Sequence, residues 1–386
     1  MTDLFAPLQS LKQGDWFKLI CGASFQHLPA VRSLTLAYTL AGADCIDVAA
    51  DPAVIAAAQA ALRVAKSLAR DAQKRGFDYK GNSPFLMVSL NDGEDPHFRK
   101  AQFNPAECPT DCPRPCERIC PAQAIVFNSI KEDFSGVVSE KCYGCGRCIP
   151  ICPYGIIDTL SSASTPGAIA PLVMSTGIDA VEIHTKVGRL AEFEQLWQVI
   201  SPWADQLKVL AISCPDGEGF TEYLKALHDL IAPLKSALIW QTDGRPMSGD
   251  IGDGTTLAAV KLGQKVLAAK LPGYVQLAGG TNSYTIAKLK AMGLLKKAGG
   301  DEGAGGDEGA GGATTSSPPS SPISGVAYGS YARVLLSPIL EQLENKEVSN
   351  TKDKAAVRLE EDDVLLWQAV ELAHSLVSQI KSQYGR

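Results

Sequence analysis

The sequence predicts an α/β fold, a (β/α)8 TIM-like barrel interrupted by a small cysteine-rich insertion. Two observations predict it. Short apolar segments rich in β-forming residues alternate with helical segments along most of the 386 residues, and eight of the eleven cysteines lie between Cys108 and Cys152. The alternation is typical of a parallel sheet covered by helices, and the crowded cysteines indicate a separate unit that holds metal.

The predicted strands and helices follow one another in the order that a barrel requires. The strands are expected at residues 17–21, 45–48, 85–90, 180–183, 208–213, 237–240, 274–278 and 325–328. The helices are expected at residues 29–40, 52–75, 168–174, 189–200, 221–230, 255–269, 282–292 and 335–343. Eight strands with seven crossover helices favour a closed barrel, although a doubly wound open sheet shows the same alternation.

The residues that follow the last two strands favour the barrel over the open sheet. They are Gly279 and Gly280 after the seventh strand and Gly329 and Ser330 after the eighth. Barrels build phosphate sites at these places from backbone amides and a helix N-terminus, and the layout resembles flavin-binding barrels of the dihydroorotate dehydrogenase type. The four residues are therefore our candidates for a phosphate or flavin site, with an ordinary tight turn as the alternative.

Two cysteine blocks carry the strongest motif of the chain. The second block, Cys142-Tyr-Gly-Cys145-Gly-Arg-Cys148-Ile-Pro-Ile-Cys152-Pro153, matches the C-x2-C-x2-C-x3-C-P run of bacterial ferredoxins. The first block, Cys108-Pro-Thr-Asp-Cys112-Pro-Arg-Pro-Cys116-Glu-Arg-Ile-Cys120-Pro121, keeps the final C-x3-C-P, but each of its earlier gaps is one residue wider. The insertion is thus predicted to be a 2×[4Fe–4S] ferredoxin-like domain.

Ligands in two-cluster ferredoxins interlace, because the fourth cysteine of each block binds the other block's cluster. We therefore expect one cluster on Cys108, Cys112, Cys116 and Cys152, and a second on Cys142, Cys145, Cys148 and Cys120. The wider gaps of the first block leave open whether its site holds four irons or three. Zinc tolerates varied spacing but takes only four ligands, and disulfides suit small secreted scaffolds, so both are weaker alternatives.

These features predict how the chain is divided. Residues 11–90 form the first part of the barrel, residues 91–164 the inserted domain, and residues 165–344 the rest of the barrel. A Gly/Asp/Glu/Ser/Pro-rich linker at residues 297–324 is expected to be disordered, because it cannot bury apolar surface. Residues 345–386 form a charged, helix-prone tail with an apolar stripe that begins at Val364 and should cap the barrel or bind a partner.

Composition limits the location and the partners. No apolar run is long enough to span a membrane, and no signal peptide is visible, so we expect a cytoplasmic protein without a transmembrane segment. The net charge of −6 argues against nucleic acid as a partner. Basic residues around the cysteines could favour an acidic redox carrier or simply form a solvated face; they are Arg99, Lys100, Arg114, Arg118, Lys131, Lys141 and Arg147.

Polar residues at the carboxyl ends of the barrel strands are further site candidates, because barrel active sites lie on that face. They are His184, Lys186, Cys214, Asp216, Gln241, Asp243, Arg245 and Asn282. Each has a structural alternative as a turn or core residue. Since the insertion follows the third strand, it should also lie on that face.

The whole arrangement resembles the cyanobacterial light-dependent period protein family, LdpA. The resemblance rests on the opening Trp16-Phe-Lys-Leu-Ile-Cys-Gly-Ala-Ser24, the eight-cysteine insertion, the stretch Gln241-Thr-Asp-Gly-Arg-Pro-Met-Ser-Gly-Asp250 and the stretch Leu277-Ala-Gly-Gly-Thr-Asn282. It implies an iron–sulfur redox sensor that couples the light-dependent redox state of the cell to the circadian clock. It also implies KaiA, CikA and SasA as partners, and it carries over no catalytic residue.

Two other classes of function stay open. The chain could be an iron–sulfur oxidoreductase whose barrel holds a flavin fed by the clusters, which leaves its status as an enzyme undecided. It could also be an electron-transfer module that docks through its tail.

Overall fold

The computed structural model describes residues 6–22, 27–77, 79–93, 99–120, 123–129, 134–139, 141–142, 148–161, 170–171, 173–244, 255–295, 323–349 and 358–381. Eight parallel strands close into a barrel in the order β1, β12, β11, β10, β9, β8, β3, β2. The predicted barrel is therefore confirmed, and the open sheet is wrong.

The barrel strands lie where the apolar segments predicted them. They are β1 (Trp16–Ile20), β2 (Cys45–Ala49), β3 (Phe85–Asn91), β8 (Ala180–His184), β9 (Val209–Cys214), β10 (Ala237–Asp243), β11 (Tyr274–Ala278) and β12 (Gly325–Tyr328). Almost every residue in them is buried, because one face of each strand lines the barrel interior and the other packs against helices.

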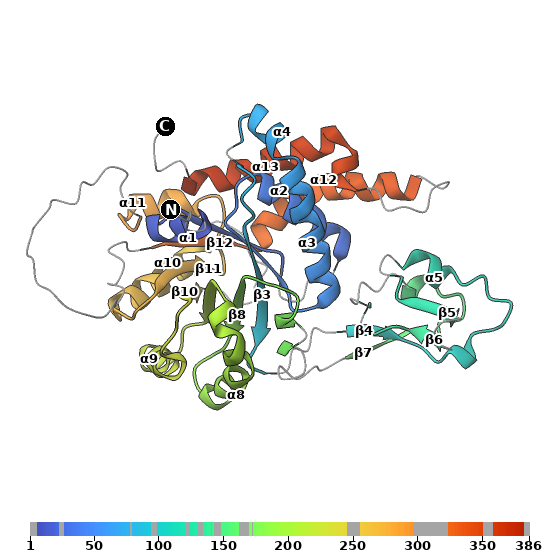
Figure 1. Cartoon of the computed structure of the whole chain (residues 1–386), viewed down its shortest axis with the longest axis horizontal. Helices are drawn as coiled ribbons and strands as arrows, with labels where there is room; N and C mark the ends of the chain where they lie inside the picture. Colours follow the sequence, from blue (N-terminus) through green and yellow to red (C-terminus); the bar gives the residue numbers. More distant parts are fainter. Residues whose placement is uncertain are drawn as a thin grey trace, which may run out of the picture.

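Helices surround the barrel (Figure 1). They are α1 (Ala6–Gln13), α2 (Leu28–Leu40), α3 (Pro52–Ser67), α4 (Ala69–Lys74), α8 (Leu190–Ile200), α9 (Phe220–Ile231), α10 (Thr256–Ala268), α11 (Thr285–Ala291), α12 (Ser330–Ser349) and α13 (Asp363–Lys381). Helix α3 shows why these segments start where they do: Pro52 opens it and the Asp51 side chain accepts hydrogen bonds from the amides of Ala53 and Val54. The predicted helix at residues 168–174 lies partly outside the described residues.

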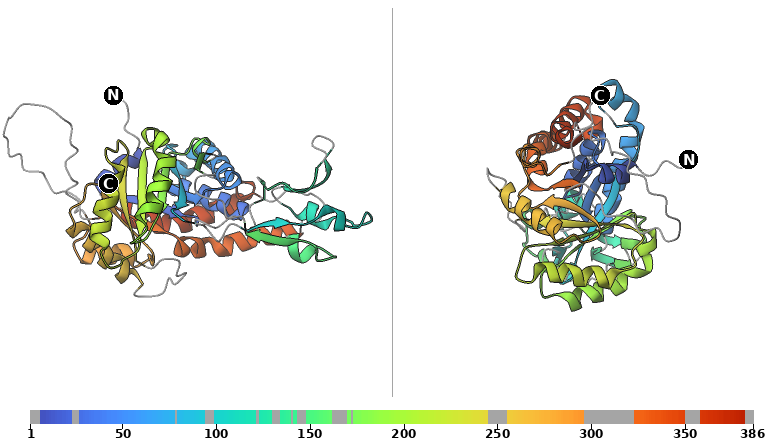
Figure 2. Two further views of the ribbon diagram at one scale, coloured as in Figure 1. Left: turned by 90° about the horizontal axis from the view of Figure 1, so that it is seen from below. Right: turned by 90° about the vertical axis from the view of Figure 1, so that its left-hand side faces the viewer.

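The tail packs on the barrel. Helix α13 contacts α2 and α12 (Figures 1 and 2), and it buries most of its predicted apolar stripe, including Trp367 and Val370, whereas Val364 at the start of the stripe is exposed. At its end, Lys381 donates hydrogen bonds to both carboxylate oxygens of Asp44, which in turn accepts from the Phe17 amide. Removal of the tail would therefore expose the barrel core.

The cysteine-rich module is inserted between β3 and β8. It contains two small antiparallel sheets, one of β4 (Arg99–Gln102) with β7 (Asp158–Ser161) and one of β5 (Ile125–Ser129) with β6 (Phe134–Val137). Its helices are η1 (Pro105–Glu107), α5 (Pro115–Ile119) and α6 (Cys148–Ile151). Figures 1 and 2 show the module projecting from the barrel on the side opposite α1.

The other predicted segments lie only partly within the described residues. Ile323 and Ser324, at the end of the predicted linker, are buried, and their amides donate to Leu294 and Val275. The rest of that linker is outside the described residues. None of the described helices is both long and apolar enough to cross a membrane.

Candidate functional site

The first predicted ligand set lies together in the module. Cys108 lies near Cys112 and Cys152, and desolvation together with these two neighbours raises the pKa of its thiol. Desolvation together with the neighbouring Cys152 and Cys108 also raises the pKa of Cys116. These contacts arise because α5, which carries Cys116, packs against α6, which Cys152 follows directly. Cysteines of the two separate blocks thus meet at one place.

Backbone amides point at the sulfur atoms of this set. The Arg114 amide lies 3.4 Å from Cys112 Sγ. Slight burial alone would raise the pKa of the Cys152 thiol. The backbone amides of Ile156, Tyr154 and Gly155 outweigh this effect and lower that pKa. Amide donors of this kind stabilise thiolates, which is the form that binds iron.

The second predicted set shares an apolar cluster with Cys116 of the first set. Cys142 and Cys148 are buried in a cluster that includes Ala101, Ala124 and Ile125. The Ala101 amide lies 3.4 Å from Cys142 Sγ, and the Ala124 amide lies 3.2 Å from the sulfur of Cys120. Cys145 is outside the described residues, so the complete set is not seen together.

The donor chemistry of both sets fits an iron–sulfur group. All the candidate ligands that the structure describes are free cysteines, and several accept amide hydrogen bonds. Within the described part of the chain, no three His, Cys, Asp or Glu side chains converge as they would around a single ion. This is compatible with clusters, because each thiolate binds a different iron atom and the sulfurs stay further apart.

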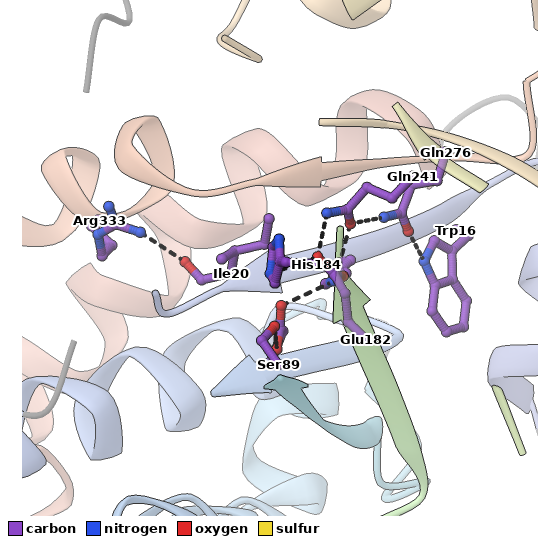
Figure 3. Close-up of polar contacts among 10 residues, drawn as sticks. Trp16, Ile20, Ser89, Glu182, His184, Gln241, Gln276 and Arg333 are labelled. Atoms are coloured by element: carbon purple, nitrogen blue, oxygen red, sulfur yellow. Dashed lines mark hydrogen bonds and ion pairs between the residues drawn. The ribbon is translucent and has the colours of Figure 1, made fainter. Parts of the chain in front are cut away.

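The barrel interior contains a buried polar network that the sequence did not reveal (Figure 3). Lys18 of β1 is completely buried and donates to Glu182 of β8 and to Gln241 of β10, whose oxygen is 3.0 Å away. Its ammonium group also lies 3.0 Å from an Asp47 carboxylate oxygen on β2. Four strands thus place one cation and two carboxylates at the centre of the barrel.

The amides of two glutamines complete this network. Gln241 Nε2 lies 2.5 Å from Glu182 Oε1, and Gln276 Nε2 lies 2.5 Å from Gln241 Oε1. The indole nitrogen of Trp16 donates to Gln276 at 2.6 Å, and beneath it the interior is apolar. The buried polar groups therefore form a connected chain, in which Asp47 Oδ2 is held by the charge of Lys18 without a hydrogen bond.

Charges decide the protonation of this network. Burial opposes the charge on Lys18, but Asp47 and Glu182 outweigh it and raise the pKa of the ammonium group. Burial also works against ionisation of Glu182, whose pKa is nevertheless lowered by Lys18 and His184. Burial raises the pKa of Asp47 and that of Asp243. The interior therefore holds a protonated lysine beside an ionised glutamate.

The structure places the candidate site residues at the strand ends in different surroundings. Gln241 belongs to the buried network, and His184, which is 28% exposed, lies above it with Nε2 3.1 Å from Glu182 Oε1. By contrast, Asp216 pairs with Lys265 on the surface, and Cys214 is buried. Lys186 is exposed, Asn282 is buried in a turn where it bonds to the Tyr284 amide, and Arg245 lies outside the described residues.

Sequence reasoning missed Lys18, Asp47 and Glu182. The signal available for them was their place in strands: each is a charged residue in the middle of an apolar segment, and Lys18 and Trp16 are two residues apart, hence on the same face of β1. Only the barrel register shows that the three face one another.

The glycines after β11 form a turn that is held by the protein itself. Gly279 and Gly280 have φ of 65° and 93°. A Cβ at Gly280 would lie 2.9 Å from the Thr255 carbonyl oxygen, and the Gly280 carbonyl accepts from the hydroxyls of Thr255 and Thr256. This packing by itself explains why residue 280 is a glycine, and no bound ligand is needed to explain it.

The residues after β12 are arranged differently. Ser330 begins α12, next to Gly329, and its hydroxyl accepts from Arg333 at 3.1 Å. Arg333 also donates to the Ile20 carbonyl at 3.0 Å, and burial lowers the pKa of its guanidinium group. A phosphate or flavin site at Gly279, Gly280, Gly329 and Ser330 stays a prediction.

The root of the module is fixed to the barrel by a second polar cluster. Asp92 directly follows β3, and its carboxylate accepts from Arg189 Nε at 2.8 Å and from the Thr185 hydroxyl at 2.6 Å. Arg189 also donates to the Asp92 carbonyl, while Thr185 contacts the Tyr223 hydroxyl at 2.6 Å. The strand that enters the module is thus held by residues that follow β8.

The similarity to solved structures is low. Two structures of tryptophan synthase from Mycobacterium tuberculosis are each 13% identical and cover 95% of this chain and 94% of their own, with TM-scores of 0.36 and 0.38. The fold assignment rests on the strand order described above.

Comparisons with families are specific. Residues 108–163 match the model described as the LdpA Fe-S cluster-binding domain, and residues 172–379 match the Light dependent period A C-terminal domain. "Light dependent period A" of Synechococcus elongatus is 46% identical over 379 residues, which cover 98% of this chain and 95% of that protein. With a cysteine module that matches the iron–sulfur domain and a barrel that matches the C-terminal domain, this chain belongs to the light dependent period A family.

Proposed function

We propose that this protein is an iron–sulfur redox sensor that couples the light-dependent redox state of the cell to the period of the circadian clock. The observation that carries the proposal is the meeting of Cys108, Cys112, Cys116 and Cys152 at one place in a module that matches an iron–sulfur domain. The name of the Synechococcus relative supports the role in the period.

The module would hold two clusters, one on each cysteine set. The first, on Cys108, Cys112, Cys116 and Cys152, has two buried ligands, Cys112 and Cys116. The second, on Cys142, Cys145, Cys148 and Cys120, also has two buried ligands among those that the structure describes, Cys142 and Cys148. Solvent exposure and hydrogen bonds to sulfur set the reduction potential of such clusters, so the amide donors beside each set should tune its potential.

We propose four irons at the second site, whose block has the regular spacing. At the first site, the wider gaps between Cys108, Cys112 and Cys116 allow either four irons or three. When bound, such clusters store and release single electrons. The contribution of the chain is to keep the thiolates ionised with amide donors and to fix the module to the barrel through Asp92 and Arg189.

A sensor must pass its state to other proteins. The family resemblance points to the clock and input proteins KaiA, CikA and SasA as partners and to the cytoplasm as the location. The Asp92–Arg189 contact is a route for this coupling, because it joins the module to the strand end that also carries His184.

The test is anaerobic purification followed by iron and sulfide analysis and by electron paramagnetic resonance at stepped potentials. We expect iron and sulfide for two clusters, and at least one signal that changes within the physiological range of potentials. A protein that binds no cluster, or clusters that keep one oxidation state over that range, would rule out sensing by these cysteines.

A second candidate function is an oxidoreductase whose barrel binds a flavin. The observation in its favour is the mouth of the barrel, where His184 and Asp243 lie above the buried network and Arg333 stands beside the start of α12. The absorbance band of flavin in purified protein, or its appearance after flavin is added, would support this function. Protein that neither retains nor takes up flavin would exclude it.

A further inference from the structure

The module exposes three large apolar side chains on neighbouring elements. Ile119 is 38% exposed, Ile151 is 41% exposed and Tyr154 is 47% exposed. We call these three residues the α5–α6 face. Ile119 is the last residue of α5, Ile151 is the last residue of α6, and Tyr154 lies in the turn after α6; the two helices pack against each other. Single exposed apolar residues are ordinary on a protein surface, but a group of large ones on adjoining elements marks an interaction site.

This face adjoins ligands of the first cysteine set. Ile151 directly precedes Cys152, and Tyr154 follows that cysteine by two residues. Ile119 ends α5, the helix that carries Cys116, and directly precedes Cys120 of the second set. In Figure 1, α5 lies on the part of the module away from the barrel, where another protein can approach.

The charges around the face favour a basic partner. Glu107, Asp111 and Glu117 are exposed there, and a thiolate-bound cluster adds negative charge. Of the nearby cations, Arg114 stacks over the Phe127 ring with its guanidinium carbon 4.2 Å from the centroid, whereas Arg118 is exposed.

Another cation of the module is also engaged. Lys100 donates to the Ser139 carbonyl at 2.5 Å and lies 4.0 Å from an Asp51 carboxylate oxygen. Of the basic side chains of the module that the structure describes, Lys100 and Arg114 are thus held by the protein itself, whereas Arg118 and Lys141 are exposed. The three exposed carboxylates and the negative charge of a bound cluster outnumber these two exposed cations, which favours a basic carrier over the acidic one that the basic residues of the sequence suggested.

We propose that the α5–α6 face is the docking surface for a one-electron carrier protein whose own contact face is apolar with a basic rim. The inference rests on the proposed function, because it requires a cluster on the first cysteine set. In the docked pair one electron passes between the carrier and that cluster, so that one is oxidised as the other is reduced; no bond forms and no proton moves. Contacts between redox proteins are small and transient, with charges that steer the encounter.

The experiment measures electron transfer in the full-length protein with its clusters. Reduced protein is mixed anaerobically in a stopped-flow instrument with a basic, oxidised c-type cytochrome, and the rise of the ferrous haem band gives a second-order rate constant. An acidic c-type cytochrome of similar potential serves as the comparison. We expect the basic carrier to react faster, and its rate to fall as salt rises from about 20 mM to about 300 mM, because screening weakens the attraction.

Two variants test the residues. Ile119→Ser/Tyr154→Ser should lower the rate about tenfold because it removes the apolar contact. Asp111→Lys should lower the rate at low salt and weaken its salt dependence. Val364→Ser is the matched control, since Val364 is 65% exposed on α13, which packs on the barrel, and its rate should equal that of the wild type.

The outcomes separate the two proposals. Iron content and paramagnetic resonance spectra are recorded for every protein, and if the double variant loses cluster, Asp111→Lys decides alone. Unchanged rates in variants that keep their clusters, or a faster reaction with the acidic cytochrome, overturn the docking surface and leave the sensor proposal intact. A wild-type protein without clusters overturns both.

Discussion

Replacement of Lys18 by methionine should strongly destabilise the barrel. The side chain is fully buried, and its ammonium group lies 3.0 Å from both an Asp47 oxygen and the Gln241 oxygen, in addition to its bond with Glu182. Methionine fills similar space but leaves the two carboxylates without their cation. The fold therefore keeps its volume and loses its charge balance.

The magnitude follows from the geometry. At an effective dielectric constant of about 20, unit charges about 3 Å apart attract by roughly 5 kcal/mol. Part of this loss is offset, because the lysine no longer has to be desolvated and the carboxylates can take up protons. Removal of one partner from a buried ion pair costs about 3–5 kcal/mol. A barrel of this size should then lose about 6–20 °C in Tm.

The assay is thermal unfolding of the anaerobic protein followed by circular dichroism. Lys235→Met is the control, since Lys235 and its partner Asp205 are both exposed and the pair should contribute only about 0–1 kcal/mol. Without Lys18, the folded-state pKa of Glu182 rises above its unfolded value, so the loss should be larger at pH 8 than at pH 5.5.

Two results would refute this reasoning about Lys18. One is a loss below about 1 kcal/mol at pH 8, which would mean that the carboxylates are neutralised at little cost. The other is a loss of equal size at both pH values, which would mean that packing and not charge decides the stability.

Three further predictions concern other parts of the chain. Burial and the neighbouring Asp44 raise the pKa of Asp15 to about 6, although the charge of Lys381 lowers it, so the ionised form of Asp15 opposes folding. Asp15→Asn should therefore raise the free energy of unfolding, measured in urea, by about 1–2 kcal/mol at pH 8 and by less at pH 5.5. Cys116→Ser should lower the iron content by about half, because one of two clusters loses a ligand, while the spectrum of the second site remains; loss of all iron would show that the sites are not independent. Gly280→Ala should lower stability by about 1–3 kcal/mol, because its φ is 93° and its Cβ would meet the Thr255 carbonyl, and an unchanged Tm would show that the turn can relax.

The sequence determined the elements of the barrel. Each predicted strand is found within one residue at its start and three at its end, because parallel strands buried on both faces are apolar segments with clear boundaries. The cysteine spacing indicated an iron–sulfur domain for a similar local reason: ligands a few residues apart in one block can bind one cluster. Both kinds of information lie within short stretches of the chain.

Tertiary structure decided which distant residues meet. No local pattern shows that Lys18, Asp47 and Glu182 face one another, since this depends on the register of three strands that are separated by up to 164 residues. The same holds for the module, where α5 with Cys116 packs against α6, and where two of the basic residues, Arg114 and Lys100, are bound by their neighbours. Sequence determines periodicity and spacing, whereas the balance of buried charge and the exposure of a site arise only when the chain closes on itself.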